Sequence, residues 1–228
     1  MHSTPPKTES APRITGPLDW RRVVDWLKED GVITSEEARR TVARCSQAES
    51  HQHPLVRLAS VAMARAEGGR ALSLEELTEY VARHSGLAYL RIDPLKVDVG
   101  RVADAMSANY AERHKVLPVQ VTPQEVVVAT AEPFIDDWVA EVERQSRRSV
   151  RRVMANPQDI QRYMGEFFAL AKSVRAAQKS GGSASGSTFE QLVELGKTNK
   201  QLDANDQGVI RVVDWLWQYA FDQRASDI

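Results

Sequence analysis

The sequence has only one cysteine, Cys45, among its 228 residues. A single thiol cannot form a disulfide within the chain, and such a composition is typical of a reducing compartment. No apolar run approaches the roughly 18–20 residues that a membrane-spanning helix needs. The opening residues, MHSTPPKTESAPR, are polar and rich in proline, unlike a secretory signal peptide. We therefore expect a cytoplasmic protein.

Excess charge and nucleotide-binding loops are also missing. The formal net charge is −1, which gives no electrostatic footprint for nucleic acid. The sequence contains neither G-x-x-x-x-G-K-[ST] nor G-x-G-x-x-G. Its one glycine-rich stretch, SGGSASGS, has no lysine and does not follow a predicted strand. We therefore expect neither nucleic-acid binding nor nucleotide hydrolysis by this chain, which is predicted not to be an enzyme.

What is present is a soluble globular composition, with 42% hydrophobic and 27% charged residues. Two polar stretches divide it, the proline-rich start and the Gly/Ser tract, which is typical of a flexible linker. We predict a disordered leader (1–15), a helical subdomain (16–90), an α/β subdomain (91–179), a linker (180–187) and the truncated start of a further domain (188–228).

The helical subdomain is predicted from apolar periodicity and capping residues. Four helices are expected, over LDWRRVVDWLKEDG, TSEEARRTVARC, PLVRLASVAMARAEGG and SLEELTEYVARHSG. Thr34 and Ser73 have the spacing of capping-box residues, each with a glutamate three positions later. Gly31 and Gly86 follow helices as left-handed stops, and Gly68–Gly69 should end the third helix.

The second subdomain alternates strands and helices. VDVGRVADAMSANYAERH is predicted to be a helix, and 116–121 and 125–131 two strands joined by a short turn. Pro118 favours an edge or irregular strand. PFIDDWVAEVERQ reads as a helix, SVRRVMA as a strand and QDIQRYMGEFFALAKSVRAAQ, after Pro157, as a long helix. The predicted fold class is α+β: a helical subdomain, then a small three-stranded sheet with packed helices, a linker and one helix.

The histidines, the cysteine and the acidic residues do not predict a metal site or a catalytic site. His51 and His53 could be metal ligands, but no third ligand is placed with them, so a polar loop before Pro54 is favoured. Cys45 has no base or basic cluster to activate it, and a helix-face thiol is favoured over a nucleophile. The carboxylates Asp136, Asp137, Glu141 and Glu143 are predicted to form a solvated face.

The densest basic run is RRSVRR, which contains Arg147, Arg148, Arg151 and Arg152. It is either a solvated strand edge protected from aggregation or a surface for an acidic partner or anionic ligand. Alternate residues of a strand face opposite sides, so Arg151 and Arg152 should diverge. Trp20, Trp26, Trp215 and Trp217 are predicted to be packing anchors, with a stacking platform for a base as the alternative reading of Trp26.

One stretch resembles the N-terminal domain of the GspE/PilB-type ATPases of type II secretion and type IV pilus assembly, the MshE-N-like domain. The resemblance covers about 33–168 and rests on four short motifs. These are Gly86-Leu-Ala-Tyr, RHKVLP from Arg113 to Pro118, VVVA from Val126 to Ala129 ahead of Glu132-Pro133, and Pro157 opening a helix near Tyr163. The resemblance implies a regulatory and docking region without catalysis of its own.

The end of the sequence adds to this resemblance. GVIRVVDWLWQYAFDQRASDI is apolar on most of a helical circumference, and such a helix is normally buried on more than one side. In the resembling motors a similar run leads into the next domain. We therefore expect this chain to be the front part of a longer ATPase, whose ATP and Mg²⁺ sites lie in the missing portion.

The resemblance also implies partners. The docking partner would be an inner-membrane platform protein of the GspL/PilM type, placing the motor peripherally at the inner membrane, and the full-length parent would be a hexamer. A free-standing adaptor without a motor is the alternative.

Some members of the family bind cyclic di-GMP through a tandem motif that begins Arg-Leu-Gly. Here Arg22 and Gly31 lie over the first copy, and Arg57 and Leu58 over the second. Val24 and Ala59 replace the third-position glycine, and Cys45 and His84 replace the terminal glutamines. A valine side chain would hinder the close backbone approach that glycine allows. A cyclic di-GMP-sensing module is therefore an alternative function; no other cofactor is expected in this chain.

Overall fold

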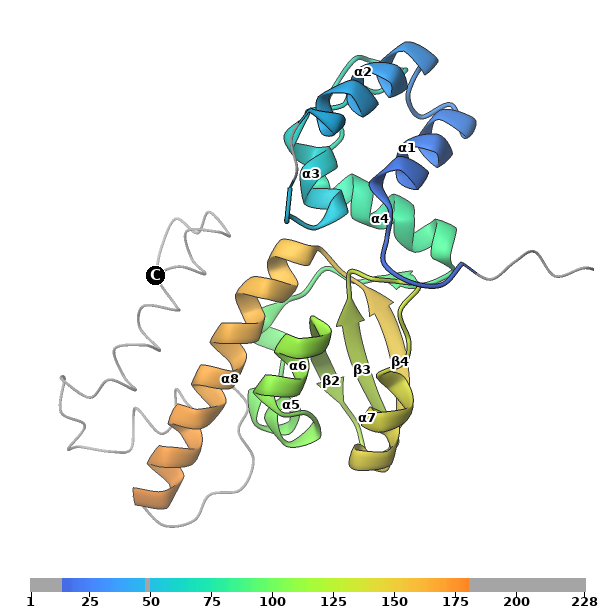
Figure 1. Ribbon diagram of the computed structural model, residues 1–228. Coiled ribbons are helices and arrows are strands. Elements are labelled where there is room, and N and C mark those ends of the chain that lie inside the picture. Colours follow the sequence, from blue (N-terminus) through green and yellow to red (C-terminus); the bar gives the residue numbers. More distant parts are fainter. Residues whose placement is uncertain (1–13, 48–49, 181–228) are drawn as a thin grey trace, which may run out of the picture.

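The fold was described from a computed structural model that covers residues 14–47 and 50–180. Figure 1 shows a group of helices at one end and a sheet flanked by helices at the other. The predicted leader lies mostly outside the described residues, and the predicted Gly/Ser linker and C-terminal domain start lie outside them almost entirely. The α+β class is confirmed.

The helical half contains four helices: α1 (Trp20–Glu29), α2 (Ser35–Ser46), α3 (Pro54–Ser60) and α4 (Leu74–Ser85). Side chains satisfy the free amides at their starts. Ser73 forms the complete capping box with Glu76. Thr34 accepts from the amide of Glu37 at 3.1 Å, but the Glu37 carboxylate accepts from the amide of Ala64 instead of returning to Thr34.

The prediction for the third helix was wrong at its end. A helix was expected as far as Gly68–Gly69, but α3 ends at Ser60. Ala62 takes a left-handed conformation with φ +50°, and the chain then doubles back to form an Ala64–Ala71 bridge. The turn between them uses positive φ at Gly68 and Gly69, which glycine adopts without strain.

The second half adds a sheet and five helical segments to the chain. In order they are β1 (Ala88–Tyr89), the 3₁₀ turn η1 (Pro94–Lys96), α5 (Val99–Ala105), α6 (Ala108–His114), β2 (Val116–Val121), β3 (Glu125–Thr130), α7 (Val139–Ser146), β4 (Ser149–Met154) and α8 (Pro157–Ser180). Helices α5, α6 and α8 contact β2, and α7 contacts β4.

The sheet has four strands in the order β1-β4-β3-β2, one more than predicted. β2 and β3 form the expected antiparallel hairpin, whose register shifts between Pro118 and Gln120. β2 is an edge strand, as the proline indicated. β3 pairs with β4 in parallel, which is possible because α7 crosses between them. The added strand, β1, pairs with only the last two residues of β4.

Two helices differ from their predicted lengths. The segment expected as a single helix splits into α5 and α6 because Met106 is extended and Ser107 caps α6. The helix expected from Pro133 begins later, at Val139. In both places the apolar spacing is compatible with a continuous helix, and local capping and turns decide otherwise.

The described residues form two hydrophobic clusters, one in each half. The helical cluster draws on residues from Leu18 to Ala82, and the sheet cluster on residues from Ile92 to Ala171. Met154, the last residue of β4, is fully buried in the helical cluster. The sheet therefore contributes a side chain to the core of the helical half.

Polar contacts also join the two halves. The Glu132 carboxylate accepts from the amide of Leu18 at 2.7 Å and lies 3.3 Å from Nε2 of His53. In the opposite direction, Glu75 of α4 accepts from the Tyr89 hydroxyl and, at 3.0 Å, from Nδ2 of Asn156. Each half thus provides a carboxylate that binds groups of the other half.

Candidate functional site

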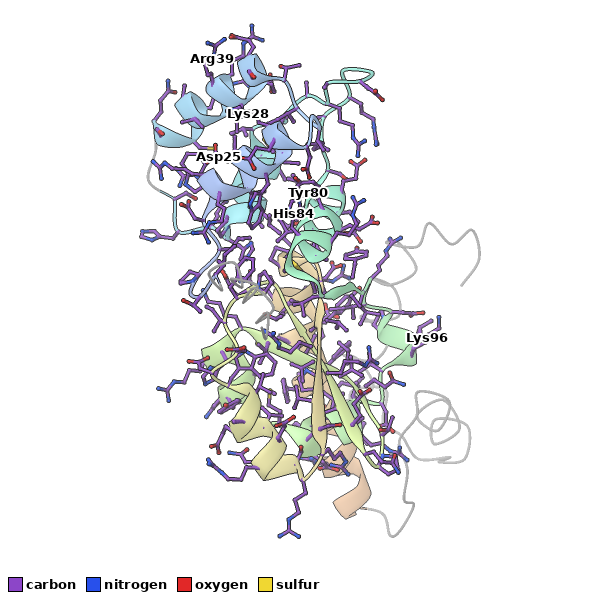
Figure 2. The ribbon with its side chains drawn as sticks, turned by 90° about the vertical axis from the view of Figure 1, so that its right-hand side faces the viewer. Asp25, Lys28, Arg39, Tyr80, His84 and Lys96 are labelled. Carbon is purple, nitrogen blue, oxygen red and sulfur yellow. The ribbon has the colours of Figure 1, made fainter. Side chains whose placement is uncertain are left out.

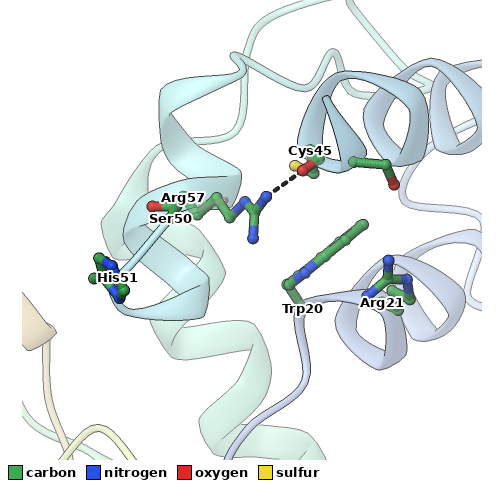
Figure 3. Close-up of a pocket in the computed structure, with 7 residues that line it drawn as sticks. Trp20, Arg21, Cys45, Ser50, His51 and Arg57 are labelled. Atoms are coloured by element: carbon green, nitrogen blue, oxygen red, sulfur yellow. Dashed lines mark hydrogen bonds between the residues drawn. The ribbon is translucent and has the colours of Figure 1, made fainter. Parts of the chain in front are cut away.

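The principal candidate site is a cavity of about 380 Å³ in the helical half, between α1, the end of α2 and α3 (Figure 3). Its described lining consists of Trp20, Arg21, Cys45, Ser46, Ser50, His51 and Arg57. None of these residues carries a carboxylate. The cavity volume falls within the range typical of small-molecule sites.

Two guanidinium groups lie against the ring of Trp20. The Cζ of Arg21 is 4.3 Å from the ring centroid and that of Arg57 is 5.3 Å from it. Cation–π attraction stabilises both positions. Arg57 also donates a hydrogen bond to the carbonyl of Cys45, which ties α3 to the end of α2 (Figure 3).

The pKa of the Cys45 thiol depends on the charges around this cavity. Burial raises this pKa above the ordinary value, and Arg57 and then Arg21 act in the opposite direction. Both guanidiniums are therefore within electrostatic reach of the same point. The net shift is upward, so the structure gives Cys45 none of the activation that a nucleophile needs.

The residues predicted to bind cyclic di-GMP do not lie together at one site in the structure. Arg57 lines the cavity, whereas Arg22 is exposed on α1 and is absent from the described lining. Gly31 is exposed in the turn after α1, with φ +68°. Leu58 is fully buried in the helical cluster, as is Val24, with 1% of its surface exposed. The ligand assignment of these residues stays a prediction.

A second cavity, of about 330 Å³, lies where α1 and α4 meet and is lined by Asp30, Val32, Tyr80, Arg83 and His84. Asp30 accepts from the Tyr80 hydroxyl and lies 2.8 Å from Nε2 of His84. These two contacts hold the pKa of the Asp30 carboxyl below its ordinary value, with His84 the larger influence. Burial first, and then the bond to Asp30, raise the pKa of Tyr80.

Sequence reasoning missed this second cluster. Tyr80 and His84 are four residues apart on α4, a spacing that places them on one helical face (Figure 2). That spacing was the available signal, but the sequence does not reveal that Asp30 lies opposite. Trp26 stacks on His84, with centroids 4.9 Å apart, and makes an edge contact with Phe134. Both contacts support the packing role predicted for Trp26.

The predicted basic run does not form one uniform patch. Arg147 and Arg151 are exposed, and Arg151 pairs with Glu125 at 3.0 Å. Arg148 and Arg152 are half-buried and donate to backbone carbonyls, those of Ser146 and Pro133. The edge of β4 is also only partly open, because β1 pairs with its last two residues.

The remaining candidate groups have structural partners. Nδ1 of His53 accepts from the amide of Leu55, so this histidine caps α3. No group of three or more potential metal ligands occurs among the residues the structure describes. Glu143, predicted to lie on a solvated face, instead accepts from the amide of Val150 at 3.0 Å. Within the described ranges, no helix is long and apolar enough to cross a membrane.

Comparison with known proteins agrees with the resemblance. Residues 85–174 match the family model of the MshEN domain. The chain is 30% identical over 217 residues to the type IV pilus assembly ATPase TfpB of Acinetobacter baylyi (strain ATCC 33305 / BD413 / ADP1), an alignment that covers 92% of this chain. The chain spans 37% of the length of that relative.

Solved structures show weaker similarity. A structure of MshE with cdg has a TM-score of 0.48 and 15% identity, covering 64% of this chain and 98% of that one. The N-terminal domain of XpsE has a TM-score of 0.38 and 16% identity, covering 63% and 92%. All of these scores lie below 0.5, so the assignment rests on the sequence matches. By those matches, residues 85–174 are similar to the MshEN domain and most of this chain is similar to part of a type IV pilus assembly ATPase, which supports an N-terminal domain of the GspE/PilB type.

Proposed function

We propose that this chain is the non-catalytic regulatory and docking region of a type II secretion or type IV pilus assembly ATPase. The observation that carries the proposal is the match to a type IV pilus assembly ATPase along 92% of this chain but only 37% of the relative. ATP and Mg²⁺ would bind in the remainder of the motor. The region would act in the cytoplasm, held at the inner membrane by a partner and assembled as part of a hexamer.

The docking partner in this proposal is a platform protein of the GspL/PilM type, and the surface is the exposed part of the basic run. Arg147 and Arg151 are the members that solvent reaches. Arg147 is the left-handed C-cap residue of α7, two positions before β4. Exposed arginines can recognise carboxylates of a partner through two parallel hydrogen bonds. Arg148 and Arg152 are left out of this surface, since they donate to backbone carbonyls of this chain.

The experiment is a binding titration between the chain and the cytoplasmic region of the platform protein. The double change Arg147→Glu and Arg151→Glu should weaken binding by about tenfold or more, equivalent to roughly 1.4 kcal/mol. Arg39→Glu is the matched control, because Arg39 is exposed on α2, at the far end of the molecule from β4 (Figure 2). Absence of binding by the wild-type chain would refute the docking role, and equal losses in both variants would refute the surface.

The absence of catalysis is tested separately. The chain alone should show only background ATP hydrolysis, and turnover above background would overturn the non-catalytic assignment. The alternative of a free-standing adaptor is tested by sequencing the gene beyond this chain. A phosphate-binding loop encoded there would show that the chain belongs to a motor and would refute the adaptor.

A cyclic di-GMP-sensing module is a second candidate. It is favoured by one observation, the position of Arg57 in the wall of the Trp20 cavity. Val24 counts against it, because its buried side chain occupies the place of the motif glycine. Calorimetry with cyclic di-GMP decides the matter: absence of heat at high micromolar ligand would eliminate this candidate.

A further inference from the structure

The ring of His53 lies where three segments of the chain meet. As the N-cap residue of α3, His53 accepts through Nδ1 from the amide of Leu55 at 3.2 Å. Its Nε2 lies 3.3 Å from Oε1 of Glu132, in the segment that follows β3. The other carboxylate oxygen, Oε2, accepts from the amide of Leu18, ahead of α1, at 2.7 Å. One ring and one carboxylate therefore connect α3, the sheet half and the segment before α1.

The two ring nitrogens of His53 are satisfied unequally. Nδ1 accepts a hydrogen bond, which assigns the neutral tautomer with its proton on Nε2. That Nε2 atom is shielded from solvent and makes no hydrogen bond among the described residues, although a carboxylate oxygen lies 3.3 Å away. The side chains of His53 and Glu132 are only 16% and 19% exposed. A buried donor without a partner raises the free energy of the state that contains it.

A protonated imidazole has the opposite requirements. Both of its nitrogens donate, so Nδ1 can no longer accept from the Leu55 amide. The Glu132 carboxylate attracts the positive charge, and a charge-assisted bond at Nε2 is stronger than a neutral one. Glu132 is itself held in place, since its amide donates to the Thr130 hydroxyl at 3.0 Å. Neutral His53 therefore favours the cap of α3, and charged His53 favours Glu132.

Other charged groups approach α3 from two directions. Helix α8 also contacts α3 and carries Asp159 and Arg162 in its first two turns, and both of these residues have partners. On α3 itself, Arg57 lies one turn beyond His53 and donates to a backbone carbonyl at the end of α2. The carboxylate that lies beside the ring of His53 is that of Glu132.

We propose that His53 is a pH-sensitive latch, which on protonation releases the first turn of α3 and closes on Glu132. As the pH falls through the range in which imidazole gains its charge, the ring exchanges the Leu55 amide for Oε1 of the carboxylate. Leu18 keeps its bond, because that bond uses the other carboxylate oxygen. Acidification thus loosens the start of α3 while the junction with the sheet half stays closed. The latch requires neither the docking surface nor a bound ligand.

The test is nuclear magnetic resonance of the full chain, labelled with nitrogen-15. The titration runs from about pH 8 to about pH 5.5, which spans the charge change of imidazole and stays above that of ordinary carboxylates. At the upper end, the ring shifts of His53 should place the proton on Nε2. As the ring titrates, the protection factor of the Leu55 amide, corrected for the intrinsic effect of pH on exchange, should fall about threefold or more, as for loss of an N-cap. Protection of the Leu18 amide should not fall.

Two variants separate the roles of the ring. His53→Asn keeps a side-chain oxygen that can cap α3 but has no imidazole charge, so protection of Leu55 should not depend on pH. Glu132→Gln removes the charge that attracts the protonated ring, so release of Leu55 should require a lower pH. His114→Asn is the control, because His114 lies at the end of α6 with its ring against Tyr110. It should keep the pH dependence of the wild type.

Several results would overturn the latch. These are a proton on Nδ1 at the upper pH, a ring that gains no charge within the titration, or constant protection of Leu55 while the ring titrates. Equal pH dependence in His53→Asn, or release at the wild-type pH in Glu132→Gln, would also overturn it. If either variant fails to fold, the wild-type titration decides alone, since it follows His53, Leu55 and Leu18 directly.

Discussion

The helical half and the sheet half of this molecule are stabilised in different ways. In the sheet half, β3 is buried from Val126 to Thr130 and sits in a continuous apolar cluster. The helical half has four helices of 7 to 12 residues, whose starts depend on polar caps. It also contains both of the cavities described above. The sheet half therefore depends mainly on apolar burial, and the helical half carries both described cavities.

The two halves are nevertheless joined. At the junction, which is the region where they meet, they share a core residue and polar contacts. Met154 extends the apolar core of the helical half from the end of a strand. Glu132 and Glu75 bind across the junction in opposite directions. The bond from the Gly16 amide to the Phe134 carbonyl and the edge contact between Trp26 and Phe134 also join the halves, and the side-chain contacts can be removed individually.

The largest effect is expected from Met154→Ala. Truncation of a fully buried methionine leaves a cavity and should lower the free energy of unfolding by about 2–5 kcal/mol. Because Met154 belongs to β4 and to the helical cluster, urea unfolding followed by circular dichroism should show one transition at a lower midpoint. Met106→Ala, within the sheet cluster alone, is the comparison. Two separate transitions, with the sheet unaffected by Met154→Ala, would show that the halves are independent.

A smaller loss is expected from Glu132→Gln. The carboxylate is 19% exposed, accepts from the amide of Leu18 and lies beside His53. Weakening a charge-assisted contact at such a site should cost about 1–3 kcal/mol in the free energy of unfolding. Glu125→Gln removes a more exposed ion pair, with Arg151, and should cost at most about 1 kcal/mol. Equal effects in chemical denaturation would mean that Glu132 does not hold the junction.

Asn156→Ala tests the second contact across the junction. Asn156 caps α8 by accepting from the amide of Gln158 at 2.9 Å, and it donates to Glu75. Loss of such a cap costs about 0.5–2 kcal/mol. Amide hydrogen exchange should accelerate in the first turn of α8 and near Glu75 in α4. Faster exchange in α8 alone would show that the bond to Glu75 contributes nothing to coupling.

The smallest effect is a dependence of stability on pH within the helical half. The pKa of Asp30 is lowered in the folded state, so its contribution is complete above its ordinary value of 3.8 and disappears as the pH falls through the folded-state value. His84, Tyr80 and Arg83 share its cavity. Asp30→Asn should therefore flatten the acid limb of a plot of the urea midpoint against pH. Asp25→Asn, exposed on the same helix, should leave that limb unchanged; an acid limb of wild-type slope in Asp30→Asn would rule out this role.

Prediction from the sequence succeeded where local patterns are sufficient. The β-branched residues of 116–121 and 125–131 predicted the hairpin, and Pro118 predicted its irregular edge. The Ser73 capping box and the Gly86 stop predicted both ends of α4. The third helix failed because its end depends on Ala62 and on a bridge to Ala71. The strand β1 was missed because two residues carry no periodicity.

The sequence alone therefore determined the class of fold, the sheet hairpin and most helix starts, since these follow from side-chain spacing and caps within a few residues. It also carried the family resemblance that the comparisons support. Only the tertiary structure brought Arg21 and Arg57 to one tryptophan ring, and Asp30 to His84. The bond between Leu18 and Glu132 joins residues 114 positions apart. Such contacts depend on how separate elements pack, which no local pattern records.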